Sequence, residues 1–169
     1  MTPQLLALLV TALLNHFPHT PSRACIEARQ TEIVAHLDVA HGLGVPPGIM
    51  LAVAFHETHV GCDRNEGGGW GAPIDMQHRH VAGTPEHAIR ALRRSFEVCG
   101  DWTGAVSRFR SGLCQLPASD RRNGYVRSVL GLAQSLYAAV PPGEPVGPFR
   151  IERARQHRAL RASLRPGGE

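Results

Sequence analysis

The sequence has no lysine, few aromatic residues and no long hydrophobic run. Of its 169 residues, 43% are apolar and 19% are charged, a balance that excludes a largely disordered chain. No apolar stretch reaches the roughly 18 residues that would span a membrane. The absence of a Cys-x-x-Cys pair argues against a zinc ribbon. No segment alternates at period two for long enough to require a β-sheet.

All eighteen basic residues are arginines, and their distribution is uneven. Residues 1–149 contain as many acidic residues as arginines, whereas residues 150–169 contain six arginines and two acidic residues and account for the net charge of +4. Because a nucleic-acid-binding domain usually carries its charge across the body of the fold, we expect no nucleic-acid partner. The tail could contact a protein partner or an anionic surface, or it could be a solvated helix.

Hydrophobic periodicity predicts an all-α chain. We expect helices over residues 3–17, 22–41, 48–59, 85–98, 102–111, 123–138 and 149–163. These helices define one domain over residues 1–139, a Pro/Gly linker over 140–148, and a basic C-terminal helix and tail over 149–169. The glycine-rich stretch 60–84 is a long loop, and such loops in small domains are usually functional.

The first predicted helix has an alternative interpretation as a targeting signal. Its apolar stretch LLALLVTALL has the length of a signal-peptide core, and Ser22-Arg23-Ala24 has the spacing of a cleavage site. However, no Lys or Arg precedes the stretch, and Thr2 and Pro3 are typical of a helix start. We therefore favour an added helix packed against the core.

Four cysteines allow two disulfides in any of three pairings. Cys99 and Cys114 flank one short helical segment and are the preferred pair, and Cys25 with Cys62 then follows by elimination. Buried free thiols are the alternative. Two disulfides would suit a protein that works outside the cytoplasm.

The chemically most distinctive segment is FHETH, residues 55–59, at the end of the most apolar predicted helix. Val53 and Ala54 precede Glu57 by about one turn. Partial desolvation and the negative end of the helix dipole would both favour the protonated carboxyl, as a general acid requires. The plainer alternative is a solvated glutamate in a last helical turn.

The same segment invites a metal-site interpretation. A zincin motif places two histidines four residues apart with the glutamate between them. Here His56 and His59 are three residues apart, so this segment does not match the zincin motif. His78 and His80 could join them, but we expect neither a metal nor another cofactor.

Four segments, taken in order, resemble the catalytic domain of soluble lytic transglycosylases and the related goose-type lysozymes. They are HGLGVPPGIMLAVAFHETHVG, GGGWGAPIDMQ, AVSRFRSG and NGYVRSVLGL. The resemblance covers about residues 28–136 and leaves out the first helix and the tail. It implies a lysozyme-like domain that cleaves the glycan strands of peptidoglycan. Such an enzyme would act in the periplasm, after secretion, or from a phage particle, opening the wall locally during phage entry or around a secretion machine.

By this resemblance Glu57 is the catalytic acid/base. Positions matched to the family's substrate cleft are Thr58, Gly71, Ala72, Met76, Gln77, Arg110 and Tyr125. Phe109 and Gly112 match an aromatic and a glycine of the family, and core packing is the better interpretation of Phe109.

Several residues depart from the family pattern. Arg110 stands where the family has an asparagine, and a cation beside Glu57 would weaken it as an acid. Pro73 and Ile74 replace the residues that usually follow Gly-Ala, and Asp75 brings a charge where an apolar side chain is common. These departures leave open a peptidoglycan-binding module that has lost the chemistry.

The number of carboxyl groups distinguishes two reactions. Hydrolysis normally needs two carboxyls, whereas a lytic transglycosylase can work with one and releases 1,6-anhydro-N-acetylmuramic acid ends. Asp63, Glu66 and Asp75 are the nearby candidates for a second carboxyl. We expect transglycosylation at the bond between N-acetylmuramic acid and N-acetylglucosamine, with a hydrolytic lysozyme as the alternative.

Overall fold

The computed structural model describes residues 1–63, 69–71, 84–117 and 120–140. Within these ranges the regular structure consists of seven helices and no strand, so the all-α prediction is confirmed for this part of the chain. The linker beyond residue 140 and the basic helix over 149–163 lie outside the described residues and stay predictions. No helix in the described ranges is long and apolar enough to span a membrane.

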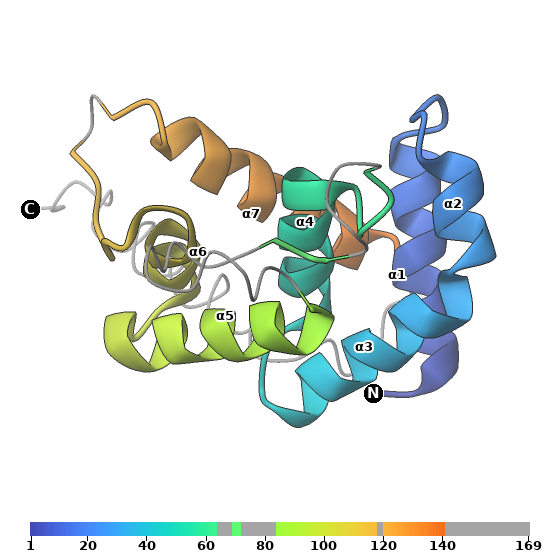
Figure 1. The fold of residues 1–169 in the computed structure, drawn as a ribbon, viewed down its shortest axis with the longest axis horizontal. Helices are drawn as coiled ribbons and strands as arrows, with labels where there is room; N and C mark the ends of the chain where they lie inside the picture. The colour runs from blue at the N-terminus through green and yellow to red at the C-terminus, as the bar shows by residue number, and fades with distance from the viewer. Residues whose placement is uncertain (64–68, 72–83, 118–119, 141–169) are drawn as a thin grey trace, which may run out of the picture.

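The helices follow one another with short connections over most of the chain. They are α1 (Pro3–His16), α2 (Arg23–Ala28), α3 (Gln30–Gly42), α4 (Pro47–Thr58), α5 (Pro85–Cys99), α6 (Trp102–Ser111) and α7 (Asn123–Ala138). In Figure 1, α4 occupies the middle of the molecule, between α1 and α2 on one side and α5 and α6 on the other.

Helix α4 is central because it is apolar nearly all round. Every residue from Pro47 to Phe55 is buried, as expected for a helix without a polar face. Its first turn packs on α7, where the Gly48 N–H donates to the Tyr137 hydroxyl at 3.0 Å. A Cβ at Gly48 would come within 2.7 Å of the Tyr137 ring, so glycine allows this close approach. The contact fixes the start of α4, and with it the position of the opposite end.

The apolar stretch near the N-terminus forms α1, as the favoured interpretation predicts. Thr2 is its N-cap, Pro3 is in its first turn, and all its leucines except Leu8 are buried in the core, where the helix packs against α3, α4 and α7. This helix therefore belongs to the body of the fold.

The prediction of one helix over residues 22–41 is wrong in detail, because the structure has α2 and α3 on either side of Arg29. At Arg29 the backbone departs from helical angles, with φ −101° and ψ 11°. The Arg29 guanidinium donates to the carbonyls of Val60 and Gly61, at 3.3 and 2.9 Å. The break thus occurs where the chain contacts the turn after α4, a long-range contact that periodicity cannot show.

Two disulfides join distant parts of the described chain, in the pairing that the sequence analysis preferred. Cys25 in α2 pairs with Cys62 in the turn after α4, and Cys99 at the end of α5 pairs with Cys114 beyond α6. No described cysteine is free. Two disulfides are consistent with a location outside the reducing cytosol.

Candidate active site

Glu57 lies in the last turn of α4 and is largely enclosed. Its side chain is 11% exposed, and Val53 and Ala54, about one turn earlier, are fully buried. The glutamate is thus held on the most buried helix of the fold, close to its end.

Arg110 and Tyr125 approach Glu57 from two other helices. The Nη1 atom of Arg110, in the last turn of α6, lies 3.2 Å from Oε2 of Glu57. The Arg110 guanidinium carbon also lies 5.4 Å from the centre of the Tyr125 ring, at the start of α7, within cation–π range. Three helices therefore bring an acid, a cation and a phenol together, although Arg110 and Tyr125 follow Glu57 by 53 and 68 residues in the sequence.

The inner atoms of this group lack partners. Glu57 Oε1 and the Tyr125 hydroxyl are both buried, and neither forms a hydrogen bond of regular geometry with a described residue, although the Tyr125 hydroxyl is close enough to the Glu57 carboxyl to interact with it. Burial, together with the nearby charge of Glu57, raises the pKa of Tyr125 above its ordinary value. Tyr125 therefore remains a neutral phenol that can donate a hydrogen bond. Buried polar atoms without partners are unusual in folded proteins and are frequent where a ligand binds.

Gly71 packs directly against the Glu57 side chain. Its φ is +92°, which strongly favours glycine, and a Cβ at this position would lie 2.7 Å from the Glu57 Cγ. Gly71 thus lies against the Glu57 side chain and restricts its movement. Trp70, the residue before it, is fully buried and meets the edge of the His36 ring.

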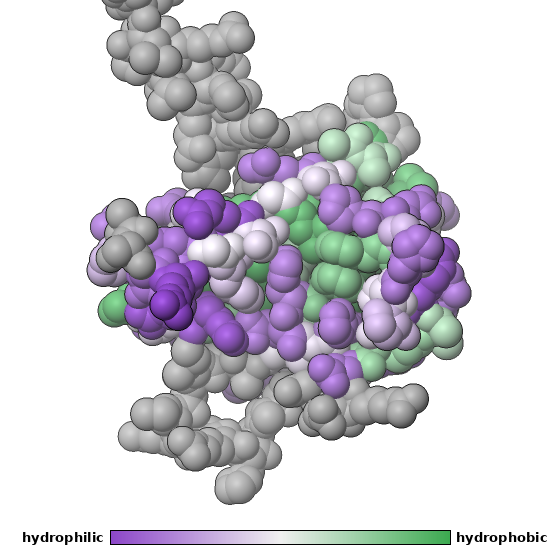
Figure 2. Space-filling view, turned by 90° about the horizontal axis from the view of Figure 1, so that it is seen from above, coloured by the Kyte–Doolittle hydropathy of each residue, from purple (hydrophilic) through white to green (hydrophobic). Residues whose placement is uncertain are grey.

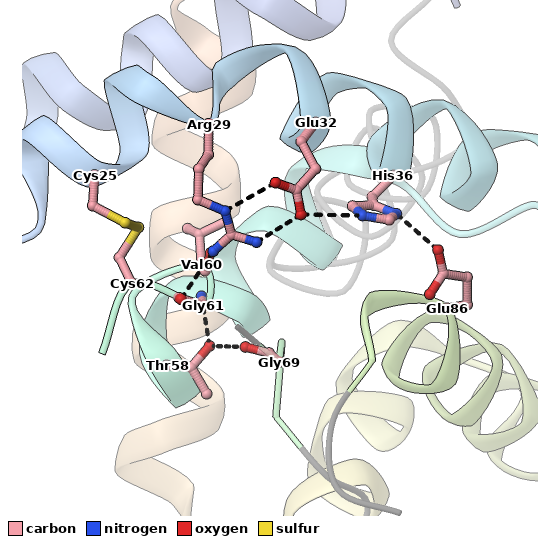
Figure 3. Close-up of polar contacts among 10 residues, drawn as sticks. All are labelled: Cys25, Arg29, Glu32, His36, Thr58, Val60, Gly61, Cys62, Gly69 and Glu86. Atoms are coloured by element: carbon pink, nitrogen blue, oxygen red, sulfur yellow. Dashed lines mark hydrogen bonds and ion pairs between the residues drawn. A yellow bond between two sulfur atoms is a disulfide. The ribbon is translucent and has the colours of Figure 1, made fainter. Parts of the chain in front are cut away.

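Thr58 has a positioning role in the structure. The side chain is buried, with a relative exposure of 3%. Its hydroxyl accepts from the Gly61 N–H at 2.9 Å and donates to the Gly69 carbonyl at 2.6 Å (Figure 3). These bonds hold residues 69–71 beside the end of α4, and the expected contact of Thr58 with substrate stays a prediction.

A chain of polar side chains, Arg29, Glu32, His36 and Glu86, supports the end of α4 from outside (Figure 3). Arg29, which binds the carbonyls of Val60 and Gly61, also pairs with Glu32 at 2.7 Å. His36 lies between Glu32 and Glu86, at 3.7 and 3.0 Å. The chain links α3 to the start of α5 and to the turn after Glu57. Nothing in the sequence pattern singles out these residues.

The turn that follows α4 has an uncommon backbone. His59, Val60 and Gly61 all have positive φ, at 48°, 60° and 74°. This region is disfavoured for β-branched residues such as valine, and it persists only where the surroundings enforce it. Arg29, the Thr58 hydroxyl and the Cys25–Cys62 disulfide all bind this turn. The support for the turn therefore also defines where the glutamate helix ends.

Thr58→Val tests this support, because it keeps the shape of the side chain and removes the hydroxyl. We expect a loss of about 2–3 kcal/mol in the free energy of unfolding, since the Gly61 N–H and the Gly69 carbonyl would both lose a buried partner. Thr58→Ser keeps the hydroxyl and should cost only about 1 kcal/mol. Denaturant unfolding of both variants checks this, and equal losses would show that the hydroxyl bonds contribute little.

The structure separates the histidines of the metal-site interpretation. The His56 ring lies 6.1 Å from Tyr125 with its edge toward that ring, whereas the His59 ring meets Phe55 at 5.2 Å. Burial lowers the pKa of His56, so it adds no second cation beside Glu57 at neutral pH. The described residues contain no group of three or more His, Cys, Asp or Glu that could hold a metal ion. His78 and His80 lie outside them.

Several predicted site residues cannot be placed. Ala72, Met76 and Gln77, with Pro73, Ile74 and the candidate carboxyls Glu66 and Asp75, lie outside the described residues. Asp63 is described and partly exposed, and its N–H donates to the Thr58 carbonyl at 3.0 Å. Phe109 is buried in the core, and Gly112 ends α6 with φ +80°.

A pocket on another side of α4 was not expected from the sequence. It measures about 450 Å³ and lies between the end of α1 and the end of α4. Its walls are His16, Phe17, Pro18, His19, Thr20, Phe55 and His59. The Phe17 and Phe55 rings stack at 4.5 Å. The face of the molecule that is seen from above Figure 1 has hydrophobic surface in its middle, bordered by hydrophilic side chains (Figure 2).

Comparisons with protein-family models, with curated proteins and with solved structures give no match for this chain.

Proposed function

We propose that this protein is a lysozyme-like glycosidase that cleaves peptidoglycan as a lytic transglycosylase. The observation that carries the proposal is the enclosed Glu57 carboxyl, with one oxygen on Arg110 and the other unpartnered beside the neutral Tyr125 hydroxyl and Gly71. A single enclosed carboxyl with one oxygen that has no protein partner suits a reaction with one acid/base group.

The reaction uses Glu57 twice. Protonated Glu57 donates its proton to the glycosidic oxygen between N-acetylmuramic acid and N-acetylglucosamine, and the bond from that oxygen to the muramic C1 breaks. The C6 hydroxyl of the same muramic residue then attacks C1, while the Glu57 carboxylate accepts its proton. The products are a free N-acetylglucosamine 4-hydroxyl and a 1,6-anhydro end, no water is consumed, and Glu57 is again protonated.

Tyr125 and Gly71 would support these steps. The raised pKa of Tyr125 keeps its hydroxyl protonated, so it can donate to the Glu57 carboxylate that forms when the proton is transferred. Gly71, packed on the Glu57 side chain, limits the positions that the carboxyl can take. Arg110 also stabilises the carboxylate, but in the resting site it opposes the first proton transfer.

That opposition favours a second candidate, a binding module of the same fold without catalysis. A third, the hydrolytic lysozyme, would need Asp63, Glu66 or Asp75 as its second carboxyl.

Incubation of the purified protein with peptidoglycan sacculi distinguishes these three functions when the soluble fragments are identified by mass. We expect anhydro-terminated fragments. Reducing-end fragments would indicate the lysozyme, and an absence of fragments together with sacculus binding would indicate the binding module.

We place the protein outside the cytoplasm, in the periplasm, in the medium or in a phage particle, where its substrate is found. The two disulfides support this placement. The arginine-rich tail would then contact a protein partner or an anionic wall polymer.

A further inference from the structure

Arg110 is the one described cation bound to the Glu57 carboxyl, and it is held loosely. Its side chain is 50% exposed, against 11% for Glu57. The pair has a single contact at 3.2 Å, whereas an arginine can form two parallel hydrogen bonds with a carboxylate. A half-exposed pair of this kind contributes little stability and opens readily. Of the two partners, Arg110 is the one with room to move.

The ion pair and the proposed reaction make opposite demands on Glu57. Arg110 stabilises the carboxylate, whereas the first step needs the protonated acid. In the resting site the Arg110 guanidinium contacts one oxygen of the Glu57 carboxylate, at 3.2 Å. A substrate that gave Arg110 a better anionic partner would leave Glu57 free to take a proton from solvent.

Peptidoglycan can supply such a partner beside the bond that is cleaved. Each N-acetylmuramic acid carries a lactyl group, whose carboxyl is a neutral amide when a stem peptide is attached and a free carboxylate when the peptide has been removed. Resting on the proposed function, we propose that Arg110 binds the free lactyl carboxylate of peptide-free glycan strands, so that this form of the substrate releases Glu57 from its ion pair. The protein would then act after an amidase-type reaction has removed the stem peptides.

The geometry around Arg110 suits this role. It lies at the end of α6, and its guanidinium contacts the Tyr125 ring in cation–π geometry. This contact does not involve Glu57, so it can persist when the ion pair opens. Arg108, two residues earlier, donates instead to the Gly112 carbonyl that follows α6. The two arginines lie on the same helix but contact different groups, so Arg108 provides a matched control.

The test compares three preparations of the same glycan strands: with stem peptides, peptide-free with the lactyl carboxylate, and peptide-free with that carboxylate converted to a methylamide. For the full chain we expect kcat/KM on the carboxylate form to exceed that on the methylamide form by at least about tenfold, and more at low salt. Arg110→Asn should bring the two within about twofold and raise the rate on peptide-bearing strands. Arg108→Asn should retain the preference.

Equal rates of the unaltered protein on carboxylate and methylamide strands would overturn the inference and leave the proposed function intact. A preference that survives in Arg110→Asn would overturn it as well. If no strand is cleaved, the proposed function fails, and binding decides the inference separately. Glu57→Gln, which frees Arg110, should bind carboxylate strands at least about tenfold more tightly than methylamide strands in calorimetry, and equal affinities would refute the role of Arg110.

Discussion

Replacing Glu57 by glutamine should reduce the release of anhydro-terminated fragments from peptidoglycan by about 10²- to 10⁴-fold, which is the usual contribution of a general acid/base. Glutamine keeps the length and shape of the side chain that Gly71 contacts, but it can neither donate the first proton nor accept the second. Arg110 would lose its partner, yet it is half exposed and water can solvate it. We therefore expect the free energy of unfolding to change by less than about 1 kcal/mol.

The matched control for this variant is Asp63→Asn, which removes the one described member of the candidate second carboxyls. In a transglycosylase it should leave most of the activity, because the reaction uses Glu57 alone. Fragment release and denaturant unfolding are measured for both variants. Activity that survives in Glu57→Gln would contradict the assignment of the acid/base, and a comparable loss in Asp63→Asn would favour the hydrolytic lysozyme.

Removing the Cys25–Cys62 disulfide should have the largest effect on stability. The bond closes a loop with a sequence separation of 37, and loss of that constraint on the unfolded chain costs about 4 kcal/mol. Cys25→Ala combined with Cys62→Ala should accordingly lower Tm by about 10–15 °C. The same variant should also lose activity at temperatures where it is folded, because Cys62 holds the positive-φ turn that follows Glu57.

The second disulfide provides the comparison. Cys99→Ala with Cys114→Ala opens a loop with a separation of only 15, at an expected cost of about 3 kcal/mol. Calorimetric unfolding measures the two losses. A smaller loss for the Cys25–Cys62 variant than for the Cys99–Cys114 variant would show that the turn after α4 is held mainly by Thr58 and Arg29.

Helix positions in this fold could be read from local sequence signals. The predicted ranges 102–111 and 123–138 agree with α6 and α7, and that of 85–98 ends one residue before α5 does. Asp101 and Thr84 cap their helices with side-chain hydrogen bonds, and Gly100 and Gly112 end them. Such signals lie within a few residues of the helix ends, which is why periodicity and capping residues are sufficient.

The break at Arg29 could not be predicted in the same way. Nor could the chain of polar side chains that runs from Arg29 to Glu86. They depend on contacts between segments that are about 30 to 50 residues apart, such as Arg29 with Gly61 and His36 with Glu86. Arginine, glutamate and histidine at these positions also suit an ordinary solvated helix face. Only the folded arrangement shows that they support the turn after the glutamate.

The candidate site was partly foreseeable. The position of Glu57 at the end of an apolar helix follows from the sequence, and the family resemblance suggested that Arg110 and Tyr125 belong to the same cleft. The contact of Gly71 with the Glu57 side chain explains why glycine is needed there, through a positive φ and a distance too short for any Cβ. The hydrogen bonds of the Thr58 hydroxyl to Gly61 and Gly69 could not be predicted, because these partners belong to turns whose paths the sequence does not reveal.

The most direct test of the central claim, that Glu57 works alone and without water, is digestion of peptidoglycan in water labelled with oxygen-18. The account predicts fragments that end in 1,6-anhydro-N-acetylmuramic acid, each lighter by one water than a hydrolysis product and free of label, and it predicts that they disappear with Glu57→Gln. Reducing-end fragments carrying one labelled oxygen would contradict it, because they would show that water attacks C1 and that a second group activates it.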